Sequence, residues 1–103
     1  MNTTGFWLVE RPLPKHSNDI AEASEARALQ CAHLRAKTAV DRAEQRFWHA
    51  AALANSGRGT QRAVADARAG LDAARAMLRR AEFALAEAKA AFGPLPRVRR
   101  AQC

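Results

Sequence analysis

The stretch VADARAGLDAARAMLRRAEFALAEAKAAF, residues 64–92, decides the fold. A large apolar side chain occurs at every seventh position, and an alanine follows three positions after each of the first four. This apolar repeat predicts an α-helix that packs along a second helix as a left-handed coiled coil. The large residues are Val64, Leu71, Leu78, Leu85 and Phe92, and the alanines are Ala67, Ala74, Ala81 and Ala88.

The first half of the chain contains a matching repeat. Between the two repeats lies NSGRGT, residues 55–60, whose asparagine and glycines can end one helix and whose Thr60 can cap the next. We therefore predict an all-α fold, an antiparallel two-helix coiled-coil hairpin with helices at about 19–54 and 60–92. The core positions of the first helix are Ala26, Leu29, His33, Ala36, Val40, Ala43, Phe47, Ala50 and Ala54.

The register of the hairpin follows from the sizes of these residues. If the chain folds about Gly57, facing residues have numbers that sum to about 114, and nearly every layer pairs a large residue with an alanine. Such layers let two helix axes approach closely while the seam stays filled. The layers are Ala50 with Val64, Phe47 with Ala67, Ala43 with Leu71, Val40 with Ala74, Ala36 with Leu78, His33 with Ala81, and Leu29 with Leu85. We expect His33 to be a neutral, packed histidine in this seam.

The two ends of the chain differ from the hairpin, which we place at residues 18–93. Residues 1–17 include the apolar patch GFWLV followed by Pro12 and Pro14, and we expect an extended segment there. The second helix should end at Gly93 and Pro94. Residues 94–103 then form a basic tail.

One seam buries little apolar surface for two such long helices, and several large apolar residues lie outside it. We predict that Leu34, Trp48, Leu53 and Met77 form a protein interface. The partner is either a second copy, which would complete a four-helix bundle, or a different protein. The alternative is that Phe6, Trp7 and Leu8 fold back over part of this surface.

No residue pattern indicates catalysis. We find no Ser/His/Asp or Cys/His arrangement and no glycine-rich phosphate loop, so we predict no enzyme, catalytic residue, cofactor, metal or small-molecule substrate. Cys31 and Cys103 lack metal-ligand spacing, and we expect free thiols in a reducing compartment. Since there is no apolar run of membrane-spanning length and no leader pattern, we predict a cytoplasmic protein without membrane contact.

The charge leaves a second function open. The 103 residues carry a net charge of +7, which attracts polyanions or acidic surfaces. Candidate nucleic-acid contacts are Arg75, Arg79, Arg80, Arg97, Arg99 and Arg100, although acidic residues interleave with the first three and no aromatic platform accompanies them. The leading prediction is a non-enzymatic interaction protein that binds a protein partner as an adaptor or inhibitor. The alternative is a basic helical protein that binds the backbone of RNA or DNA.

Overall fold

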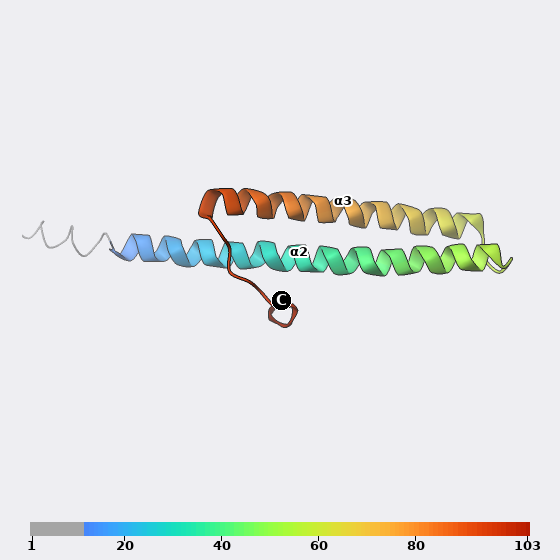
Figure 1. The fold of residues 1–103 in the computed structure, drawn as a ribbon, viewed down its shortest axis with the longest axis horizontal. Helices are drawn as coiled ribbons and strands as arrows, with labels where there is room; N and C mark the ends of the chain where they lie inside the picture. The colour runs from blue at the N-terminus through green and yellow to red at the C-terminus, as the bar shows by residue number, and fades with distance from the viewer. Residues whose placement is uncertain (1–11) are drawn as a thin grey trace, which may run out of the picture.

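The computed structural model describes residues 12–103, with side chains described from Ser24 onward. Helix α2 spans Pro12–Asn55, helix α3 spans Gln61–Phe92, and a short 3-10 turn, η1, spans Arg100–Gln102. The two long helices run side by side in opposite directions, and α2 extends past the end of α3 (Figure 1). The predicted all-α helical hairpin is therefore confirmed. Neither long helix contains an apolar segment that could cross a bilayer, within the part of the chain that the structure describes.

Helix α2 begins earlier than the sequence suggested. It starts at Pro12, so residues 12–18 are helical and not extended. Proline is tolerated in the first helical turn, because the amide hydrogen that it lacks has no intrahelical acceptor there. The prediction that Pro12 and Pro14 lie in a non-helical segment was thus wrong. Phe6, Trp7 and Leu8 lie outside the described residues.

The connection between the helices has the chemistry expected of residues 55–60. Gly57 adopts a φ of 79°, in the left-handed region that glycine occupies without steric cost. The amides of Arg58 and Gly59 both donate to the carbonyl of Leu53, at 2.8 and 3.0 Å. Thr60 then caps α3, since its side-chain oxygen accepts a hydrogen bond from the amide of Ala63 at 3.1 Å.

The seam has the predicted register at its centre. Ala43 and Leu71 are 2% and 3% exposed and form one buried cluster with Ala74, against which Val40 and Phe47 pack. Five of the eight buried residues described are alanines, which explains how two helices can fill their seam with so few large side chains. The other buried residues are Ala26, Cys31, Ala36, Leu85 and Ala88.

The repeat is looser at the end of α3. Phe92, which the sequence places in the seam, is 48% exposed. It is the last residue of α3, where Gly93 takes a φ of 83° and donates its amide hydrogen to the carbonyl of Lys89 at 2.9 Å. Because α3 ends at this point, no following turn of that helix shields the ring.

Residues 94–103, which we name the C-terminal strap, cross from α3 to α2 (Figure 1). The strap ends in a disulfide bond between Cys103 and Cys31 of α2, with Cα atoms 5.3 Å apart. The prediction of free thiols was therefore wrong, because the path of the strap brings together two cysteines that are 72 residues apart. A disulfide gives no support for a reducing compartment, so the cytoplasmic location stays a prediction.

Candidate functional site

The four predicted interface residues have different surroundings. Trp48 and Met77 are 67% and 60% exposed. Leu34 is half-buried and borders a hollow together with Leu95 and Val98 of the strap. Leu53 is half-buried beside the loop, whose amides bind its carbonyl. Intramolecular contacts thus account for part of the surface of both leucines, whereas Trp48 and Met77 remain open.

Trp48 is held by an aromatic neighbour that belongs to the core. The rings of Phe47 and Trp48 meet edge to face, with centroids 5.2 Å apart. Phe47 packs on the buried cluster of the seam, and Trp48 follows it by about 100° around the helix. The guanidinium of Arg68 lies 5.8 Å from the centroid of the Phe47 ring, a cation–π distance. These contacts orient an exposed indole at the edge of the seam.

Ion pairs surround this aromatic contact. Arg75 Nη2 donates to Glu44 Oε2 at 3.4 Å, and Arg68 Nε lies 3.6 Å from Asp72 Oδ1. Glu44 precedes Trp48 by four residues and therefore lies one helical turn away on the same side. We name the set of six residues the Trp48 flank: Glu44, Phe47, Trp48, Arg68, Asp72 and Arg75. Its two arginines and two carboxylates balance in charge; because they are solvent-exposed, each pair contributes at most about 1 kcal/mol to folding.

Met77 does not belong to this surface. Arg75 reaches Glu44 on the Trp48 flank, and Met77 is two residues further along, about 200° around α3. The structure therefore does not bring Trp48 and Met77 into one patch. The sequence grouped them because both fall outside the seam, a criterion that does not distinguish its two sides.

The six arginines predicted to contact nucleic acid lie in two different parts of the structure. Arg75 is paired with Glu44, and Arg79 and Arg80 are exposed on α3. Arg97, Arg99 and Arg100 belong to the strap, where η1 packs on α2 and makes no contact with α3. The six arginines consequently do not form one surface.

His33 lies at the border of the seam, where its side chain is 23% exposed and its Nε2 is 3.8 Å from Glu82 Oε2. Among the side chains that the structure describes, from Ser24 onward, no three of His, Cys, Asp or Glu are grouped as a metal site requires. Comparison of the chain with protein-family models, with curated proteins and with solved structures finds no match.

Proposed function

We propose that this chain is a non-enzymatic helical-hairpin interaction protein, and that its protein partner binds the Trp48 flank. The observation that carries the proposal is the 67% exposure of Trp48 beside a ring fixed in the core. Burying the exposed part of a tryptophan, roughly 100–170 Å², is worth about 3 kcal/mol. Tryptophan and arginine are also the residues most enriched among those that dominate binding energies.

A second copy of the chain is the partner that the charges support. The molecule as a whole carries +7, which opposes self-association, but the Trp48 flank contains two positive and two negative groups. Two such flanks related by a twofold axis can present carboxylates to arginines of the partner, because each flank carries both signs of charge. The seam of a single hairpin is built largely from alanines, so the pairing of two hairpins also supplies apolar burial that one lacks. The product is a four-helix bundle.

Light scattering and sedimentation equilibrium on the oxidised full chain test this proposal. We expect a dimer, and we expect Trp48→Ala to weaken it at least about 100-fold, the equivalent of the 3 kcal/mol above. Far-UV circular dichroism should show unchanged helix content, because Trp48 lies outside the buried core.

Met77→Ala is the matched control. Met77 is 60% exposed, close to the 67% of Trp48, but it lies about 200° around α3 from Arg75 of the flank, so the dimer should persist. A chain that is monomeric at all concentrations, or one whose dimer tolerates Trp48→Ala, would contradict self-association through the Trp48 flank. If the chain is monomeric, the partner to seek is a larger assembly that it binds as an adaptor or inhibitor.

A further inference from the structure

The strap forms two hollows against α2, and arginines from both segments border each of them. One hollow, of about 470 Å³, is bordered by Arg35 and Arg42 of α2 and by Arg100 of the strap. The other, of about 310 Å³, is bordered by Arg27 of α2 and Arg97 of the strap. Among the described residues that border the two hollows, none is acidic or aromatic. Five guanidinium groups thus gather around η1, with no aspartate or glutamate among the described residues that border the hollows.

These five arginines differ from Arg68 and Arg75 of α3. Arg68 and Arg75 each pair with a carboxylate, whereas none of the five lies within ion-pair distance of an aspartate or glutamate in the described part of the chain. All five are exposed, and so is Arg46, one turn beyond Arg42. Positive charge without an ion-pair partner among the described residues therefore gathers where the strap meets α2.

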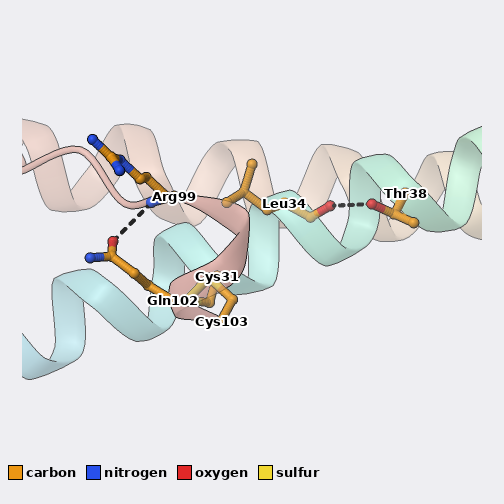
Figure 2. The surroundings of a disulfide bond; sticks show 6 residues. All are labelled: Cys31, Leu34, Thr38, Arg99, Gln102 and Cys103. Carbon is orange, nitrogen blue, oxygen red and sulfur yellow. Dashed lines mark hydrogen bonds between the residues drawn. A yellow bond between two sulfur atoms is a disulfide. The ribbon is translucent and has the colours of Figure 1, made fainter.

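The disulfide holds the strap part of this surface in place. Figure 2 shows the Cys31–Cys103 bond on α2 near Leu34 and Thr38, with η1 above it. The amide of Arg99 donates to Gln102 Oε1 at 3.0 Å, which closes the turn that carries Arg100 (Figure 2). The chemistry of the turn fixes its shape, and the bond between the sulfurs fixes its position on the helix.

We propose that the junction of the strap and α2 binds the phosphodiester backbone of a nucleic acid, and that the binding requires the disulfide. Guanidinium groups match phosphate oxygens in geometry and charge. Arg35 and Arg42 are separated by about 10 Å along the helix, so the surface spans more than one phosphate and suits a polymer. Because no aromatic side chain borders the hollows, we expect contacts to the backbone and no preference among bases.

Fluorescence anisotropy with labelled duplex DNA and labelled single-stranded RNA of mixed sequence tests the site. We expect oxidised protein to bind, with the logarithm of the affinity for duplex falling by about 4.5 per logarithm of salt concentration if all five arginines contact phosphates. The double variant Arg35→Gln/Arg42→Gln should lose at least about 10-fold in affinity and lower that slope by about 2. Arg79→Gln/Arg80→Gln removes the same charge from α3 and should lose less than about 3-fold.

The same binding assay with and without dithiothreitol tests whether binding requires the disulfide. We expect reduction to weaken binding at least about 10-fold with helix content retained, and Cys31→Ser/Cys103→Ser to bind weakly and not to respond to reductant. Equal affinity of oxidised and reduced chains would overturn the role of the strap.

Two further outcomes would overturn the site itself. Equal losses in the two double arginine variants would show that only net charge matters. Tighter binding of polyglutamate than of RNA would assign the surface to an acidic protein. The site uses different residues from the Trp48 flank, so Trp48→Ala should bind nucleic acid as the unaltered chain does, whichever way the association experiment ends.

Discussion

The exchange of one large and one small residue tests the central layer of the hairpin. Ala43 of α2 and Leu71 of α3 share the buried cluster, and each is at most 3% exposed. Leu71→Ala alone leaves a cavity and should lower the free energy of unfolding by about 2–5 kcal/mol. Ala43→Leu alone overfills the close approach of the two helices and should cost about 1–3 kcal/mol.

The double variant Ala43→Leu/Leu71→Ala tests whether these two buried residues face each other across the seam. If the two positions were independent, their costs would add to about 3–8 kcal/mol. Because they face each other, the exchange conserves the volume of the layer and should cost less than about 1.5 kcal/mol. Urea denaturation of the oxidised chain, followed by far-UV circular dichroism, measures all three values. Ala69→Leu, at an exposed position of α3, is the control and should change stability by less than about 0.5 kcal/mol. Additive costs would refute the register.

Two further predictions concern the covalent tie and the backbone. Reduction of Cys31–Cys103, which closes a loop of 72 residues, should lower the free energy of unfolding by about 4 kcal/mol through the entropy of the unfolded chain; calorimetry with and without reductant measures it, and an unchanged melting temperature would argue against the bond. Gly57→Ala should destabilise by about 1–2 kcal/mol, since φ is 79° there, and Gly70→Ala, in open space within α3, should stabilise by about 0.5–1 kcal/mol. Thermal unfolding measures both variants. If both raised or both lowered the stability, the backbone conformation described at one of the two glycines would be wrong.

The seam could be predicted from the sequence because its information is local and periodic. The spacing of Leu71 and its alanines defines one face of α3, and Gly57 limits how that face can meet α2. The exposure of Trp48 follows from the same pattern, since its position falls outside the heptad core of α2. Met77 shows the limit of this reasoning, because a residue outside the seam can lie on either side of it.

The strap could not be predicted in the same way. Its course depends on the direction in which the chain leaves Gly93, and a single turn carries no periodic signal. The alternation of Leu95 and Val98 with arginines was a weak indication that one side of the segment packs on something. Cys31 lies three residues before Leu34 and outside the predicted seam positions of α2, but only the folded path shows that Cys103 reaches it. Arg97 and Arg100 were among the predicted nucleic-acid contacts, but Arg27, Arg35 and Arg42 of α2, which border the same hollows, were missed for the same reason.

The disulfide gives the molecule a closed covalent circuit. Starting from Cys31, the chain runs along α2, through the loop, back along α3 and across the sulfur atoms to its starting point. A protease that cuts once, after the exposed Arg58, opens this circuit without dividing the molecule. The two fragments part only after a second and chemically different event, the reduction of the bond. Nicked protein should therefore keep its mass in solution until a thiol is added.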